Sequence, residues 1–121
     1  MSKVLVVEDD KPLTRALKIA FSDEGIESTV VFNGEEAISA LSEETYDVIL
    51  LDLLMPQMGG YRFLRILQDK DIQIPVIVLS NLDQRSDIMK AKRYGAVEFF
   101  TKADTPTSKI VSTIKELSQK D

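Results

Sequence analysis

The chain has 121 residues, 44% hydrophobic and 29% charged, a balance typical of one globular domain with a buried core. A net charge of −5 argues against nucleic acid or an anionic membrane as partner, and no apolar run approaches the roughly 20 residues that span a bilayer. The absence of cysteine and histidine excludes disulfides, thiolate metal sites and histidine catalysis. The N-terminus, MSKVLVV, does not resemble a signal peptide, so we expect one cytoplasmic domain over residues 1–121.

Five short apolar runs alternate with segments of helical period. The expected strands are residues 4–7, 29–32, 48–51, 76–79 and 97–100. The buried face of the first expected helix is formed by Leu13, Ala16, Leu17, Ala20 and Phe21, and that of the last by Ile110, Ile114 and Leu117. Alternating strands and helices predict an α/β domain, a parallel sheet with helices on both faces.

Turn residues support these boundaries. Asp10 is the expected N-cap of the helix that contains Pro12, and Asn33 precedes the second helix. Gly25 and Gly95 follow helical segments, as C-terminal caps do.

Strand composition predicts the order of the sheet. The first, third and fourth runs are uninterrupted aliphatic residues, as expected for strands buried on both faces. The second and fifth are flanked or broken by Ser28, Thr29 and Glu98, so we expect them at the edges. This arrangement fits the doubly wound, flavodoxin-like fold with five strands in the order 2-1-3-4-5.

Polar residues follow the strands at the edge of the sheet where such folds bind ligands. The first strand leads into Glu8-Asp9-Asp10, the third into Asp52, the fourth into Ser80-Asn81 and the fifth into Thr101-Lys102. We therefore expect Asp52 to lie at the end of its strand, before Met55-Pro56 ends the apolar run and Gly59-Gly60 opens the next helix. Asp10 is assigned to helix capping rather than to the site.

Carboxylates that converge at one edge repel one another unless a cation is bound. A site of oxygen ligands without histidine or cysteine suits Mg2+. With Lys102 and the Ser80 hydroxyl nearby, Asp52 could attack a phosphoryl group and form an aspartyl phosphate.

At these positions the sequence resembles the receiver domain of two-component response regulators, and in particular its stand-alone, chemotaxis-regulator-like members. The segments VLVVEDD, DVILLDLLMPQMGG, PVIVLSN and GAVEFFTKAD carry the resemblance. It implies a phosphorylation switch and the following roles: Asp52 as phosphoacceptor, Lys102 as phosphate-binding lysine, Ser80 as switch hydroxyl, Phe99 as switch aromatic, and Asp9, Asp52, Glu8 through water and the Leu54 carbonyl as Mg2+ ligands. For Phe99, simple core packing is an equal alternative. The implied partners are a sensor histidine kinase or histidine phosphotransfer protein, and a downstream protein target.

Some residues depart from the family pattern. Ala103 follows Lys102 where the family usually has proline after a cis peptide bond, and Asn81 replaces a very small residue. Leu54 and Leu82 stand two residues after Asp52 and Ser80, where they should hinder an attacking water, so we expect slow self-dephosphorylation.

Three alternatives compete with the phosphorylation switch. Ala103 and Asn81 leave open a degenerate receiver that acts only as a docking scaffold. A phosphatase of the haloacid dehalogenase type would need a second aspartate at Leu54, and a flavin-binding module would need a phosphate loop where Glu8-Asp9-Asp10 stands. We therefore expect no enzyme activity beyond the domain's own phosphotransfer and dephosphorylation.

Overall fold

The computed structural model describes residues 2–54, 58–82 and 85–118, in which strands and helices alternate. The strands are β1 (Lys3–Val7), β2 (Glu27–Val31), β3 (Val48–Leu51), β4 (Val76–Ser80) and β5 (Glu98–Thr101). The helices are α1 (Lys11–Asp23), α2 (Gly34–Glu43), α3 (Gly60–Asp69), α4 (Arg85–Arg93) and α5 (Thr107–Ser118). The predicted stop at Met55-Pro56 lies outside the described residues.

The sheet confirms the predicted strand order. Its five strands are parallel and run β2-β1-β3-β4-β5, with β2 and β5 at the edges. The boundaries of β2 differ from the prediction, because pairing with β1 begins at Glu27 opposite Lys3 and ends at Val31 opposite Val7. Phe32 lies beyond the strand, where its N–H donates to the Glu36 carboxylate at 2.7 Å.

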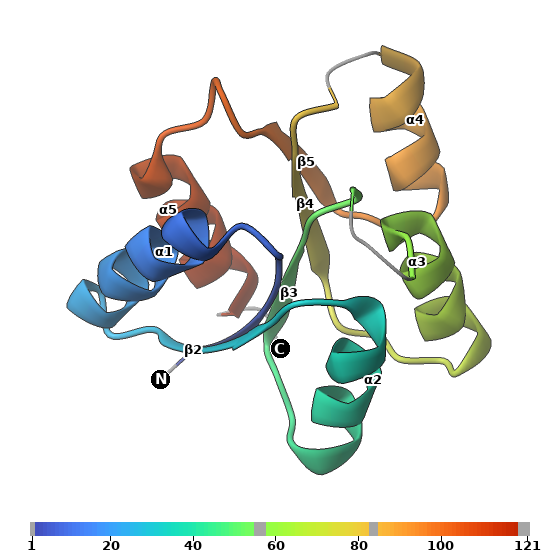
Figure 1. Cartoon of the computed structure of the whole chain (residues 1–121), viewed down its shortest axis with the longest axis horizontal. Helices are drawn as coiled ribbons and strands as arrows, with labels where there is room; N and C mark the ends of the chain where they lie inside the picture. Colours follow the sequence, from blue (N-terminus) through green and yellow to red (C-terminus); the bar gives the residue numbers. More distant parts are fainter. Residues whose placement is uncertain (1, 55–57, 83–84, 119–121) are drawn as a thin grey trace.

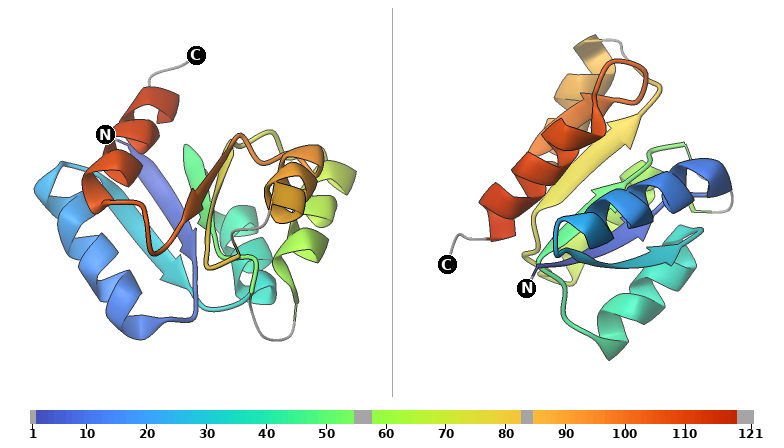
Figure 2. Two further views of the ribbon diagram at one scale, coloured as in Figure 1. Left: turned by 90° about the horizontal axis from the view of Figure 1, so that it is seen from above. Right: turned by 90° about the vertical axis from the view of Figure 1, so that its left-hand side faces the viewer.

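Helices cover both faces of the sheet, as predicted. Helices α1 and α5 lie on one face, and α2, α3 and α4 lie on the other (Figures 1 and 2). Alternate strand residues serve the two cores: Leu5, Val7, Ile49 and Leu51 face α2–α4, whereas Val4, Val6, Val48 and Leu50 face α1 and α5. None of the helices within the described residues has the length and apolar character needed to cross a membrane.

The buried stripe of α1 differs from the prediction at two positions. Leu17 and Phe21 are buried as expected, but Ala16 is exposed and Thr14 is buried instead. Successive residues are about 100° apart around a helix, so Ala16 turns away when Leu17 faces the sheet. The Thr14 hydroxyl tolerates burial because it donates to the Lys11 carbonyl at 3.0 Å.

The predicted caps are confirmed. The Asp10 carboxylate accepts from the Leu13 N–H at 3.0 Å, and the Asn33 side chain accepts from the Glu36 N–H at 2.9 Å. Gly25 and Gly95 follow α1 and α4 with φ of +74° and +106°, a conformation that favours glycine. Because Asp10 and Asn33 begin α1 and α2, the polar residues that follow β1 and β2 remain in loops.

Candidate functional site

Two buried carboxylates lie side by side where β1 and β3 end. Glu8 follows β1 and Asp52 follows β3, and their exposed fractions are only 3% and 4%. Backbone hydrogen bonds hold both positions, because the Asp52 N–H donates to the Val7 carbonyl and the Glu8 N–H to the Val31 carbonyl, each at 3.0 Å. These bonds continue the pattern of the parallel sheet one residue past each strand. They fix the backbone positions from which the two carboxylates extend.

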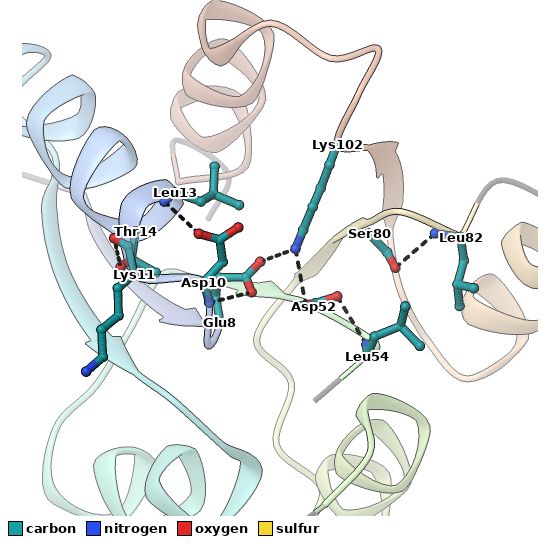
Figure 3. A network of polar contacts seen from close by, with 10 residues as sticks. All are labelled: Glu8, Asp10, Lys11, Leu13, Thr14, Asp52, Leu54, Ser80, Leu82 and Lys102. Atoms are coloured by element: carbon teal, nitrogen blue, oxygen red, sulfur yellow. Dashed lines mark hydrogen bonds and ion pairs between the residues drawn. The ribbon is translucent and has the colours of Figure 1, made fainter. Parts of the chain in front are cut away.

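A single lysine reaches both carboxylates. Lys102 follows β5, and its ammonium lies 2.6 Å from Glu8 Oε1 and 3.3 Å from Asp52 Oδ2. Figure 3 shows its extended side chain pointing from β5 toward the ends of β1 and β3. The Lys102 N–H donates to the Ser80 carbonyl at 2.9 Å, which anchors this loop to β4. The structure therefore brings together three of the residues singled out from the sequence.

Ala103 does not turn Lys102 away from the site. No peptide bond within residues 2–54, 58–82 and 85–118 is cis, so Lys102-Ala103 is trans, and the lysine still forms both ion pairs. Asn81 is exposed. Neither substitution separates Lys102 from the carboxylates, so neither favours the scaffold alternative.

Glu8, Asp9 and Asp52 form a cluster that fits a hard cation. Each can offer a carboxylate oxygen such that the three oxygens lie within 4.8 Å of one another. Asp9 is exposed, whereas the other two are buried, so the cluster opens to solvent on the side of Asp9. Oxygen donors of this kind, open to water on one side, suit Mg2+, which keeps several of its water ligands.

The electrostatics of the site also favour a bound cation. Burial raises the pKa of Glu8 to about 7, and the Asp52 charge acts in the same direction, while the ion pair with Lys102 opposes both. Burial alone would lower the pKa of Lys102, but the Glu8 and Asp52 carboxylates outweigh it and raise that pKa. One lysine thus compensates two buried carboxylates incompletely.

Three polar residues at the strand ends, Glu8, Asp52 and Ser80, each accept a hydrogen bond from the amide two positions later. The donors are the N–H groups of Asp10 to Glu8, Leu54 to Asp52 and Leu82 to Ser80, at 3.1, 3.1 and 3.3 Å. Sequence reasoning missed these contacts, although the known tendency of aspartate and serine to bond the amide two residues on was a usable signal. They orient the side chains before any ligand binds.

Ser80 is not hydrogen-bonded to either carboxylate, and Phe99 lies on β5. Ser80 is fully buried, and its Oγ accepts from the Leu82 N–H (Figure 3). Phe99 pairs in register with Val78 and is partly buried against the core under α2–α4. Core packing accounts for Phe99 in this state, and its switch role stays a prediction.

The two leucines differ in their surroundings. Leu82 is partly buried against the core, whereas the Leu54 side chain is 55% exposed. The Leu54 N–H bonds to the Asp52 carboxylate, so residue 54 adjoins that carboxylate (Figure 3). Leu54 is therefore the better placed of the two to shield a group on Asp52 from water.

Gly60 allows α3 to start directly against the loop that carries Asp52. A Cβ atom on Gly60 would lie 2.6 Å from Leu53 Cα and 3.1 Å from the Asp52 carbonyl oxygen, whereas one on Gly59 would meet nothing within 4 Å. We expect Gly60→Ala to lower the free energy of unfolding by about 2–3 kcal/mol, since backbone must move. Gly59→Ala should change it by less than about 1 kcal/mol. Urea denaturation of both variants tests this, and equal losses would contradict it.

Comparison with known proteins gives one consistent result. The model of the family described as response regulator receiver domain matches residues 4–115. The structure of the Francisella response regulator 1452 receiver domain is similar over 98% of both chains, with a TM-score of 0.94 and 34% identity. A signal receiver domain of a histidine kinase from Syntrophus aciditrophicus gives a TM-score of 0.87 at 34% identity, over 98% of this chain and 90% of that one.

Longer proteins contain similar segments. The transcriptional regulatory protein YkoG of Bacillus subtilis is 35% identical over 82% of this chain and 43% of its own length. A protein-glutamate methylesterase/protein-glutamine glutaminase of Myxococcus xanthus is 37% identical over 97% of this chain and 34% of its own length. The chain thus spans less than half the length of these relatives.

Proposed function

Because the chain belongs to the family of response regulator receiver domains, we propose that Asp52 accepts a phosphoryl group from a phosphohistidine, and that phosphorylation changes the protein-binding surface. The observation that carries this proposal is the buried Asp52 carboxylate, held 3.3 Å from the Lys102 ammonium at the end of a central strand. This arrangement supports the proposal, because a carboxylate that could act as nucleophile lies beside a cation that could neutralise phosphoryl oxygens.

The transfer needs little beyond positioning. A carboxylate oxygen of Asp52 attacks the phosphorus atom, and the new P–O bond forms as the P–N bond of the phosphohistidine breaks. The electron pair of the P–N bond stays on the imidazole nitrogen, which takes up a proton from water. Lys102 stabilises the charge on the phosphoryl oxygens, and the Leu54 N–H keeps the Asp52 carboxylate oriented.

We assign the cation to the cluster of Glu8, Asp9 and Asp52. Asp9 and Asp52 would bind Mg2+ directly, Glu8 through water, and the Leu54 carbonyl would complete the protein ligands. When bound, Mg2+ supplies positive charge to the phosphoryl oxygens. The incomplete compensation of Glu8 and Asp52 by Lys102 supports this assignment.

Phosphorylation places about two negative charges next to Lys102, and Ser80 can respond to them. Its Oγ already accepts from Leu82, and its own hydrogen, which has no acceptor among residues 2–54, 58–82 and 85–118, could donate to a phosphoryl oxygen. We propose that Ser80 moves toward the phosphoryl group and that Phe99 then packs more deeply, which would remodel the surface of α4, β5 and α5.

The expected phosphodonor is a sensor histidine kinase or a histidine phosphotransfer protein, and the output is the binding of a downstream protein. We propose that these exchanges take place in the cytoplasm. The chain's own chemistry would be limited to phosphotransfer and dephosphorylation, even though the Myxococcus relative, of which it covers 34%, is named as an enzyme.

Incubation with Mg2+ and acetyl phosphate tests the proposed function. Intact mass spectrometry should show a gain of one phosphoryl group, and chelation of Mg2+ with EDTA should prevent it. A beryllofluoride mimic should shift the amide NMR signals of residues 80–82 and 98–102. Failure to gain mass with both acetyl phosphate and a phosphorylated histidine phosphotransfer protein would contradict the proposal.

Leu54 is expected to lengthen the life of the phosphoryl group. Its backbone N–H bonds to Asp52 and its side chain is exposed, so Leu54→Asn should admit water and speed hydrolysis by about tenfold, which corresponds to about 1.4 kcal/mol. Leu54→Met, of similar volume and polarity, should stay within about twofold of wild type. The loss of phosphoryl mass after donor removal measures both rates. A wild-type half-life of seconds, or no change in Leu54→Asn, would contradict this role.

A further inference from the structure

A groove lies along the free edge of β2, away from the phosphorylation site. It has a volume of about 540 Å3 and runs between β2 and α2. Thr29, Val31 and Tyr46 contribute to its lining from the sheet side, and Glu36 and Glu43 do so from α2. The groove plays no part in the phosphotransfer described above.

The edge of β2 offers backbone groups for pairing. Glu27 and Val31 bond toward β1, so alternation directs the N–H and C=O groups of Ser28 and Val30 away from the sheet. The Ser28 carbonyl is occupied by the Lys18 ammonium at 2.7 Å. Val30 is left with its N–H and C=O directed outward, and the described residues place no further strand on that side.

The lining of the groove is acidic. Glu36, Glu43 and Glu44 contribute to it, and no lysine or arginine of the described residues does. The Lys3 ammonium lies 2.8 Å from the Glu44 carboxylate and compensates its charge. The Glu36 carboxylate accepts from the Phe32 N–H. The Lys11 ammonium lies over the ring of Phe32, which follows the carboxyl end of β2. Glu36 and Glu43 therefore leave the middle of the groove with negative charge.

Glu43 stands where helix electrostatics disfavour it. It is the last residue of α2, and the last turn of that helix has no basic residue. A carboxylate at a helix C-terminus faces the negative end of the helix dipole and costs stability. A carboxylate that is present at such a position in spite of its cost in stability points to a role in recognition.

We propose that this groove binds an extended basic segment of a protein partner, which pairs with Val30 at the edge of β2. Alternate side chains of an added strand lie on one face, so basic residues two positions apart would face α2 and reach Glu36 and Glu43. The backbone of the segment would exchange two hydrogen bonds with Val30. The partner is thus recognised by positive charge and extended conformation, without a phosphoryl group.

A capped hexapeptide of alternating lysine and threonine tests this surface on the full chain. NMR titration should give saturable shifts in residues 28–32 and 36–46. Glu43→Lys should weaken binding by about tenfold without loss of thermal stability, whereas Glu35→Lys, outside the groove on the same helix, should weaken it by about twofold or less. A peptide with proline in place of a central threonine should lose most of its affinity, since it cannot pair fully.

Two results would overturn the proposal. Equal effects of Glu43→Lys and Glu35→Lys would show that only overall charge attracts the peptide. Equal binding of the proline peptide, or the absence of saturable shifts in residues 28–32, would show that the edge of β2 does not pair.

Discussion

Asp52→Asn is expected to abolish phosphorylation by acetyl phosphate. The amide removes the nucleophilic oxygen but keeps the size of the side chain, so mass gain should fall by at least about 100-fold. The Asp52 N–H bond to Val7 and the acceptor for the Leu54 N–H are retained, so the loop should keep its course. Intact mass spectrometry after equal incubation with Mg2+ measures the loss.

Asp10→Asn is the matched control. Asp10 also lies in the loop after β1, but its side chain caps α1 by accepting from the Leu13 N–H. Asparagine caps helices equally well. Phosphorylation of this variant should remain within about twofold of wild type. If both variants lose phosphorylation, a general change in the loops after β1 and β3 is responsible. If neither does, another residue accepts the phosphoryl group.

Lys102→Met is expected to destabilise the metal-free protein by about 3 kcal/mol at about pH 8, because it leaves Glu8 and Asp52 buried without their cation. The loss should shrink as the pH falls. Burial raises the folded pKa of Glu8 to about 7, above its ordinary value of 4.5, so the folded state binds more protons and is favoured as pH decreases through this window. Urea denaturation at about pH 6 and 8 measures the difference.

Two comparisons identify the cause of this loss. Lys109→Met, on the exposed surface of α5, should change stability by less than about 0.5 kcal/mol. Glu8→Gln should recover much of the stability lost in Lys102→Met, because it removes one of the two uncompensated charges. A loss in Lys102→Met that is independent of pH and of Glu8 would show that lost packing, rather than charge, destabilises the variant.

Most of the fold followed from the pattern of apolar residues. The central strands are buried on both faces, so their uninterrupted aliphatic runs were unambiguous, and the polar residues at β2 and β5 indicated edges. One misplaced residue lay at the end of a strand and another within a helix. Phe32 is apolar but follows β2, because hydrogen bonding to Glu36 replaces pairing, and Ala16 is too small to decide which face of α1 is buried.

The site could be predicted in outline because topology alone brings the carboxyl ends of parallel strands to one edge. The direction of Lys102 could not be predicted. It depends on how β5 twists relative to β1 and β3, and the trans bond to Ala103 does not prevent its contact with both carboxylates. The acidic groove at β2 also escaped prediction, since it forms only where α2 and β2 lie beside each other in the fold.

Borohydride reduction of the phosphorylated chain tests whether Asp52 is the phosphoacceptor. An aspartyl phosphate is reduced to homoserine, which peptide mass spectrometry can assign to one position. After incubation with Mg2+ and acetyl phosphate, we predict homoserine at position 52 alone. Homoserine at position 9 or 10, or phosphate that resists reduction on Ser80 or another hydroxyl, would contradict the assignment of Asp52 as the phosphoacceptor.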